Sequence, residues 1–421
     1  MGLTARALHA YSVLALPLAF AGLPLYIHTP DFYAVQYGLS LAMMGIVLMG
    51  IRLFDAVQDP LIGWILDRVP VTGQQWVVGG ALAGMALGFL ILYVPMPFLS
   101  AWVSFTLGMI LATLCFSILV IHMNARGSLW TQDYHQKTQL TATRESYGLA
   151  GLLLAVLLPA ILTLSFPADQ TYLIYAAVFL VILGLAGVTY MGWMKRQSLE
   201  ITRPVANTTT KTRINVSGFK LFWGIYFVSS LASAIPAVLV LSFIRDRLEA
   251  ENYTGLFLIL YFVAGIAGMP LWRWLAQKTN KPSAWMSAMM LAVVAFIGAF
   301  FLSAGDVVLY AVICVASGLA LGADLAIPPS MLSDRIDRTY QTTHTSLFFS
   351  GLAFLSKLAL ALGSGFALIW LDHTGFTPGV DNSQQALISL SVIYALIPCG
   401  IKILSAGLLG AMIFFEKEST R

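Results

Sequence analysis

The chain has 421 residues, of which 59% are hydrophobic and only 10% are charged, and its net charge is +4. A soluble domain carries roughly 25% charged residues, so this composition excludes a soluble protein of the same length. Long apolar runs are separated by short polar breaks, as helices that cross a bilayer require. The runs do not alternate between apolar and polar residues, which excludes the strands of a membrane barrel.

The apolar runs predict twelve membrane-spanning helices. They cover residues 8–28, 40–66, 75–95, 100–122, 140–165, 171–194, 218–244, 254–276, 283–303, 307–332, 343–370 and 385–414. If the N-terminus is cytoplasmic, most of the 23 Lys and Arg residues fall in or beside cytoplasmic segments, and Arg245 and Arg247 fall outside. The positive-inside rule therefore predicts cytoplasmic termini and an integral protein of the cytoplasmic (inner) membrane.

A polar stretch rich in Thr and basic residues divides the spans six and six. We predict an N-terminal six-helix half at 1–195, a cytoplasmic linker at 196–217 and a C-terminal six-helix half at 218–421. The sequence PLIGWI from Pro60 is echoed by PLWRWL from Pro270, at an offset of half the chain. Parallel six-helix repeats of this kind are the plan of the major facilitator fold, an all-α membrane fold.

The second predicted span carries three charged residues. Arg52, Asp55 and Asp59 are three and four residues apart, so they share one face of a helix. A charge at mid-bilayer costs ~2.5–3.5 kcal/mol, and two carboxylates one turn apart would not both stay ionised without a cation. The pair therefore predicts a site for Na⁺ or a shared proton. The structural alternative is a salt bridge of Arg52 with one of the acids, which leaves the other acid without a role.

Three more charged residues lie well inside predicted spans, away from the span ends. Lys357 is too deep in the eleventh span to reach water easily, and the Asp pair is its obvious partner if the two halves face each other. Lys402 could snorkel or pair locally. Asp324 lies one turn before Pro328 and Pro329, where a bent helix often lines the cavity of a transporter. Its alternative role is packing or capping next to the kink.

The junction between the fourth and fifth spans is the most polar segment outside the linker. We interpret its early part, from Asn124, as a cytoplasmic loop. Arg144 and Glu145 lie at the entry to the fifth span, where they are either an interfacial anchor pair or cavity residues. Candidate substrate contacts are Arg144, Asp324, Glu145, Tyr147, Asn124 and Tyr26.

Several of these segments together resemble a known transporter family. The run DAVQDPLIG at 55–63 is similar to the signature of the glycoside–pentoside–hexuronide:cation symporters, the melibiose permease-like family of the major facilitator superfamily. Further similar segments follow in the family's order: Asp133–His135, Arg144 with Glu145, Asp334–Asp337, Lys357 with Gly363, and Gly375–Pro378. Each match is weak alone, but together they extend over nearly the whole chain.

This resemblance implies a symporter that works by alternating access. It implies that Asp55 and Asp59 bind the coupling cation, that Lys357 lies beside them, and that Arg144 lies next to the sugar. The family's sugar-binding carboxylates, however, fall on Ala19 and Val120, so a melibiose-like sugar is not expected. Lysolipid symporters of the same branch are similar in keeping the Asp pair and the lysine while lacking the sugar acids.

We therefore expect a secondary transporter coupled to Na⁺ or H⁺ that imports a small organic solute, which need not be a sugar. The alternatives are a lysolipid or amphiphile carrier, a proton-driven exporter and, from another class, a membrane-embedded enzyme or sensor. The sequence has no phosphate loop, metal-ligand spacing or nucleophile elbow, so we expect neither an enzyme nor a cofactor. We expect a monomer in contact with membrane lipid, and no nucleic-acid partner.

Overall fold

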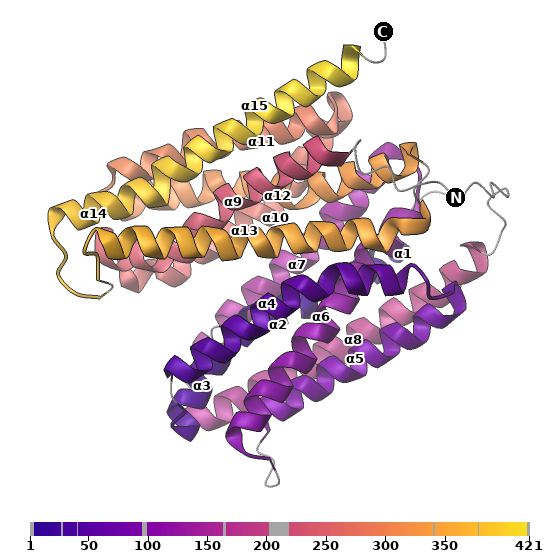
Figure 1. The fold of residues 1–421 in the computed structure, drawn as a ribbon, viewed down its shortest axis with the longest axis horizontal. Coiled ribbons are helices and arrows are strands. Elements are labelled where there is room, and N and C mark those ends of the chain that lie inside the picture. The colour runs from indigo at the N-terminus through magenta and orange to yellow at the C-terminus, as the bar shows by residue number, and fades with distance from the viewer. Residues whose placement is uncertain are drawn as a thin grey trace. The chain divides into compact units, whose positions relative to one another are not determined.

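The structure is a computed structural model that describes residues 4–26, 28–39, 41–94, 99–162, 166–201, 219–339, 342–377 and 379–418. These residues form helices and contain no strand (Figure 1). Most of the predicted linker and Pro378 lie outside them. The described part of the chain divides into two compact units. The N-terminal unit takes the chain to residue 212 and also 336–351, and the C-terminal unit takes 213–335 and 352–421.

The N-terminal unit contains the first eight helices. They are α1 (Ala5–Ser12), α2 (Ala15–Tyr26), α3 (His28–Tyr37), α4 (Leu41–Leu66), α5 (Val71–Tyr93), α6 (Ala101–Trp130), α7 (Tyr134–Leu162) and α8 (Ala168–Ile201). Polar residues fix some of the starts: the Thr4 hydroxyl accepts the N–H of Ala7 at the start of α1, and the Ser100 hydroxyl accepts that of Val103 at the start of α6. The first predicted span is thus two helices.

The C-terminal unit contains α-helices interrupted by short π-helical and 3₁₀ turns. Its elements are α9 (Lys220–Ser242), η2 (Phe243–Arg247), η3 (Glu251–Tyr253), α10 (Thr254–Lys278), α11 (Lys281–Phe296), η4 (Ile297–Phe301), α12 (Val307–Arg338), η5 (Thr342–His344), α13 (Thr345–His373), α14 (Gln384–Ser391), η6 (Val392–Leu396) and α15 (Ile397–Glu418). The turns η2 and η6 are π-helical and the other three η turns are 3₁₀. The end of α12 and the first turns of α13 belong to the N-terminal unit.

Nine helical segments in the described part of the chain are long and apolar enough to cross a membrane. They coincide with the predicted third, fourth and sixth to twelfth spans. The other three predicted spans fall on α1 with α2, on α4 and on α7, which are also helical. The protein is therefore an integral multi-pass membrane protein, while the count of twelve spans and the cytoplasmic termini stay predictions.

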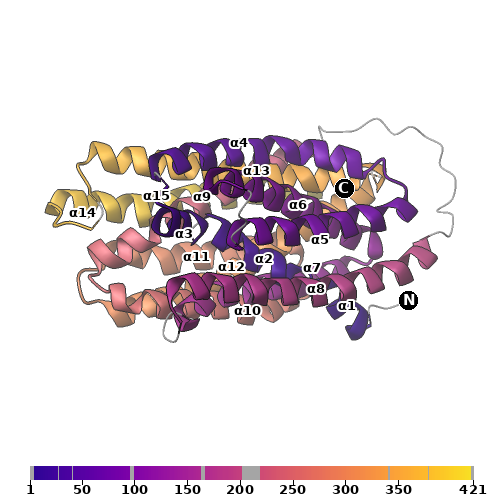
Figure 2. The ribbon, with the colours of Figure 1, turned by 90° about the horizontal axis from the view of Figure 1, so that it is seen from below.

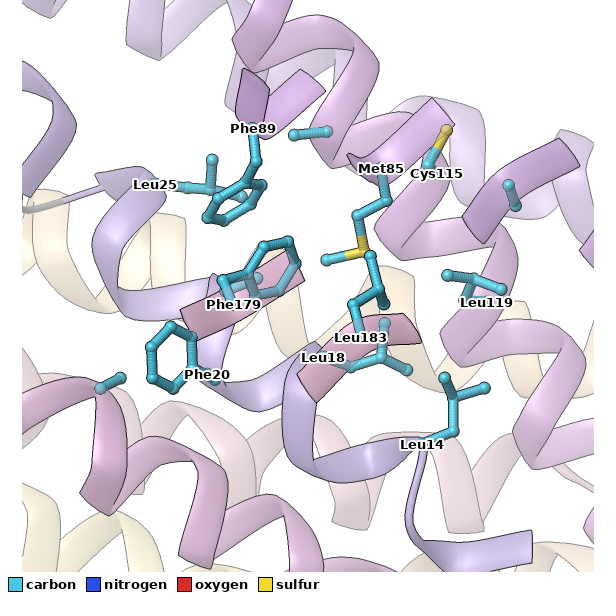
Figure 3. Packing of buried hydrophobic residues seen from close by; sticks show 14 of the residues in the cluster. Leu14, Leu18, Phe20, Leu25, Met85, Phe89, Cys115, Leu119, Phe179 and Leu183 are labelled. Carbon is cyan, nitrogen blue, oxygen red and sulfur yellow. The ribbon is translucent and has the colours of Figure 1, made fainter. Parts of the chain in front are cut away.

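Apolar packing joins the helices of the N-terminal unit (Figure 3). Helices α5, α6 and α8 run side by side (Figures 1 and 2), and Phe89 of α5 stacks on Phe179 of α8 with ring centroids 3.8 Å apart. Phe20 of α2 stacks on Phe179 from the other side. Helices α2 and α7 approach so closely that a Cβ atom on Gly151 would lie 2.0 Å from the Leu16 carbonyl oxygen. Only glycine fits there.

Residues 336–351 are fixed to the N-terminal unit by polar contacts. The Asp67 carboxylate, just after α4, accepts the backbone N–H groups of Ser346 (2.8 Å) and Leu347 (2.9 Å) at the start of α13. An anion at a helix N-terminus accepts hydrogen bonds from N–H groups that have no partner within the helix, and it interacts favourably with the positive end of the helix dipole. Lys137 forms an ion pair with Asp337. This segment therefore packs as part of the N-terminal unit, although it belongs to the second half of the sequence.

One prediction about local structure was wrong. Residues 124–130, expected to be a loop, form the last two turns of α6, and the connection to α7 is only residues 131–133. Arg126, counted as a loop residue, is therefore a buried helix residue. The helix continues because this stretch has no proline, and residues such as His122 and Arg126 find partners inside the unit. His122 Nδ1 lies 3.2 Å from the Tyr190 hydroxyl.

Candidate functional site

The two acids of α4 are deeply buried. The exposed fraction is 5% for Asp55 and 0% for Asp59, whereas Arg52, on the previous turn, is exposed. Oδ1 of Asp55 accepts two hydrogen bonds of 3.0 Å, from Gln58 Nε2 and from the Ser117 hydroxyl of α6. These are neutral donors, so they orient the carboxylate without cancelling its charge. Two carboxylates thus lie buried one helical turn apart, and the contacts of Asp55 Oδ1 include an amide and a hydroxyl.

Gln58 adds a third oxygen to this region. Its Oε1 atom is buried and accepts no hydrogen bond from the described residues. A buried acceptor without a donor is costly, and a cation is one species that satisfies it. Among the described residues no three His, Cys, Asp or Glu side chains gather as a metal site. A cation at Asp55 and Asp59 would therefore complete its shell with amide, hydroxyl or water oxygens.

The sequence analysis missed Gln58 and Ser117. Gln58 was within reach of a sequence argument, because it follows Asp55 by three residues and so lies on an adjacent turn of the same helix. Ser117 was not, because it comes from α6 and its approach to Asp55 depends on how α4 and α6 pack. The predicted charge partner Lys357 is half-buried on α13 in the C-terminal unit. Its pairing with the acids stays a prediction.

Arg144 and Glu145 form an ion pair on α7. Arg144 is 3% exposed, and its Nε and Nη2 atoms both donate to Oε1 of Glu145, at 2.9 and 2.5 Å. Glu145 is 24% exposed and its Oε1 is the acceptor of both bonds. Tyr147 is half-buried, and its hydroxyl lies 3.1 Å from Nδ1 of His9 on α1. Arg144 also interacts with the Tyr11 side chain of α1. A buried guanidinium of this kind is suited to recognise an anion.

One of the two positions where the resemblance implies a sugar-binding acid, Ala19, is near this ion pair. A Cβ atom on Gly148 would lie 3.9 Å from both the Ala19 Cβ and Oε2 of Glu145, so α2 brings Ala19 beside the pair. Asn124 donates its side-chain N–H to the Val120 carbonyl at 2.9 Å, and its Oδ1 is buried and accepts no hydrogen bond from the described residues. Tyr26 ends α2, but its side chain lies outside the described residues.

Asp324 lies on α12 with partners inside the C-terminal unit. Its Oδ1 accepts the Trp285 indole N–H at 2.8 Å, and its Oδ2 accepts from Lys402 Nζ at 2.5 Å. The side chain of Asp324 is 18% exposed and that of Lys402 is 6% exposed. Of the two alternatives for Lys402, local pairing is what the structure contains. A solute-binding role for Asp324 stays a prediction.

The sequence matches the family described as MFS/sugar transport protein over residues 8–416. The chain belongs to this family. The chain and the mouse (Mus musculus) sphingosine-1-phosphate transporter MFSD2B are 22% identical, over 85% of this chain and 78% of that protein. Identity to the chicken (Gallus gallus) sodium-dependent lysophosphatidylcholine symporter 1 is also 22%, over 91% and 81%. The glucuronide carrier protein homolog of Escherichia coli K12 is 22% identical, over 89% and 85%.

A solved structure supports the fold of this MFS/sugar transport protein. A bacterial homologue of the iron transporter ferroportin, in an outward-facing state, aligns with a TM-score of 0.68 at 15% identity and covers 96% of this chain and 98% of that one. The fold is therefore that of the major facilitator superfamily. The relatives are transporters and not enzymes, which agrees with the expectation of transport.

Proposed function

We propose that this MFS/sugar transport protein is a cation-coupled secondary transporter of the inner membrane, related to the glycoside–pentoside–hexuronide symporters. The observation that carries the proposal is the buried acid pair of α4. Asp55 and Asp59 place two carboxylates, whose negative charge is costly there, in an apolar layer, and Oδ1 of Asp55 accepts hydrogen bonds from Gln58 and Ser117. Na⁺ or a proton would relieve this charge in one conformation and leave in the other, which couples the ion to alternating access.

The solute that we propose carries an anionic group. Arg144 is buried, and two of its nitrogen atoms donate to one oxygen of Glu145, so a phosphate or carboxylate could compete with Glu145 for the guanidinium. The names of the relatives give the same chemistry, because sphingosine-1-phosphate, lysophosphatidylcholine and glucuronides each carry a phosphate or a carboxylate. We propose import as the direction of transport.

A lysolipid or other amphiphile is the second candidate for the solute. It is favoured by Ala19 and Val120, since apolar residues occupy the positions where a sugar would need acceptors for its hydroxyls. Ala19 lies next to Glu145 and Gly148, so an apolar side chain lies beside the ion pair of Arg144 and Glu145. That combination suits a solute with one charged end and one apolar end.

The experiment is solute uptake into proteoliposomes that contain the purified protein. Radiolabelled glucuronide, lysophosphatidylcholine and sphingosine-1-phosphate are each offered with Na⁺, with choline in place of Na⁺, and with an imposed pH gradient. A coupled carrier accumulates one of them only in the presence of Na⁺ or the gradient. Uptake that neither ion affects, for a solute that is clearly transported, contradicts the cation coupling.

The Arg144→Lys variant tests the anionic solute. It keeps the positive charge but loses the planar fork of donors, so uptake of the preferred anionic solute should fall at least tenfold in kcat/KM. The matched control is Lys137→Arg, which keeps the ion pair with Asp337 outside this region. Equal uptake by Arg144→Lys and the wild type would contradict direct recognition by Arg144.

A further inference from the structure

A charged group lies where several helices of the C-terminal unit meet. Lys402 of α15 and Asp324 of α12 form an ion pair of 2.5 Å, and both lie among the transmembrane helices. Ser229 and Ser233 of α9 and Trp285 of α11 surround the pair. Tyr261 of α10 is also close enough to interact electrostatically with Asp324. No role in the α4 site or at Arg144 accounts for this group.

The ammonium of Lys402 has three donors and all three are used. It donates to Oδ2 of Asp324 at 2.5 Å, to the Ser229 hydroxyl at 2.9 Å and to the Ser233 hydroxyl at 3.2 Å. A simple ion pair requires only the carboxylate. Here two serines four residues apart on α9 present both hydroxyls to the same nitrogen, which is the spacing that places side chains on one helix face.

The immediate surroundings of the nitrogen in these contacts are one carboxylate oxygen and two hydroxyl oxygens. A hard metal cation prefers ligands of the same type. Asp324 is fixed from its other side by the Trp285 N–H at 2.8 Å, and Ser233 also donates to the Ser229 carbonyl at 3.3 Å. The oxygens are therefore held in place by the protein around the nitrogen and do not depend on Lys402 alone for their positions.

We propose that this group is a monovalent-cation site that the chain fills with its own lysine. The ammonium of Lys402 is a positive charge covalently attached to the chain, and it occupies the place that Na⁺ or Li⁺ would take. The existence of this site does not depend on the function proposed above. Its role in transport does. If the acids of α4 bind the exchangeable cation, then the site in the C-terminal unit is permanently occupied and adds no second ion to the cycle.

Removing the ammonium should open this site to a free ion. Met in place of Lys402 keeps most of the side-chain stem and deletes the charged nitrogen, leaving a space next to three oxygens. We expect Lys402→Met to gain stabilisation by Na⁺ or Li⁺ that its parent lacks. A ligand that binds only the folded state raises the melting temperature, here by roughly 2 °C or more at saturating salt.

The test compares melting temperatures in NaCl, LiCl, KCl and choline chloride at equal ionic strength. It uses the wild type, Asp55→Asn, Lys402→Met and Asp55→Asn/Lys402→Met. The difference in sodium response between each Lys402→Met protein and its parent reports on the C-terminal site alone. A wild type without any sodium response would count against the α4 site alone. The proposal on Lys402 is tested only by the additional rise in melting temperature that Na⁺ or Li⁺ gives to each Lys402→Met protein over its parent.

Three controls separate a cation site from a general salt effect. Lys402→Arg retains a positive charge and should gain no sodium response. Asp324→Asn/Lys402→Met lacks the anion and should gain none, and Ser229→Ala in Lys402→Met should raise the salt concentration needed for half the effect severalfold. If Lys402→Met does not survive extraction in choline, its monodisperse yield in NaCl against choline provides the same comparison. An equal response in Lys402→Met and its parent, or a gain that persists without Asp324, overturns the proposal.

Discussion

The two units handle buried carboxylates in different ways. In the N-terminal unit Asp55 is oriented by the neutral groups of Gln58 and Ser117. In the C-terminal unit Asp324 receives the ammonium of Lys402, a charged donor from the same unit. The hydrogen bonds from Gln58 and Ser117 orient Asp55, whereas Lys402 both orients Asp324 and neutralises its charge. This contrast motivates our proposal that the ion is exchanged in the N-terminal unit.

The two copies of the repeated sequence, PLIGWI and PLWRWL, also differ between the units. Asp59 precedes the PLIGWI motif of α4, and at the equivalent place in α10 the residue is Met269, which is buried. Around it α10 packs directly on α12: the Trp272 indole donates to the Leu319 carbonyl at 2.6 Å, and a Cβ atom on Gly268 would lie 2.7 Å from that oxygen. One copy of the motif thus positions acids, and the other copy packs two helices together.

The largest effect is expected from the acids of α4. Asp59→Asn should abolish accumulation against a gradient, because it removes one charge from the cation site, while exchange of solute across the membrane can continue. Uptake and counterflow in proteoliposomes measure the two activities separately. The matched control is Asp306→Asn in the C-terminal unit, where the carboxylate caps the Ser303 N–H outside the bundle. Wild-type accumulation by Asp59→Asn would falsify the role of the acid pair.

The lysine of the C-terminal unit should matter for stability. Lys402→Ala leaves the half-buried Asp324 with an uncompensated charge, so the cost should lie below the ~3–5 kcal/mol of a fully buried broken pair. Adding Asp324→Asn removes that charge and should restore much of the loss. Unfolding of the purified proteins in choline chloride measures both. A double variant that is as unstable as the sum of the two single variants would show that the pair is not a coupled unit.

The predicted pairing of Lys357 with the acids can be tested by coupling. If Lys357 neutralises the acids in the absence of a cation, Lys357→Ala should impair transport, and adding Asp55→Asn should cost less than the two single changes summed. Interaction energies of 0.5–3 kcal/mol are usual for residues that contact each other. Initial uptake rates of the four proteins complete the cycle. Strict additivity would mean that Lys357 acts elsewhere.

A smaller effect is expected from Ser117. Ser117→Ala removes one hydrogen bond to Asp55 and should weaken cation binding about threefold to tenfold, which corresponds to the usual ~0.5–1.5 kcal/mol of such a bond. The Na⁺ concentration for half-maximal uptake measures it. Thr113→Val is the matched control, because this hydroxyl, one turn earlier on α6, bonds only to the carbonyls of Met109 and Ile110 in the described contacts. Equal weakening in both variants would contradict a specific role of Ser117.

The sequence was sufficient for the helices and for part of the site. Apolar runs can only be helices in a bilayer, so the elements are predictable, and Asp55 and Asp59 are conspicuous because charges are rare there. The end of α6 was missed because polar residues such as Arg126 looked like a loop, although the unit buries them. Ser117 and the partners of Lys402 come from other helices, and their approach depends on packing that periodicity does not specify.

The π-helical turn η6 changes the angular positions of the residues of α15 relative to those of α14. A π turn closes its hydrogen bonds five residues apart and so inserts an extra residue into the helix. One residue of an α-helix corresponds to about 100° of rotation, so a helical wheel begun at Gln384 assigns Lys402 to the wrong side. Deleting one residue within Val392–Leu396 would restore an unbroken α-helical phase. It would also rotate Lys402 away from α9 and α12 without changing a single side chain around Asp324.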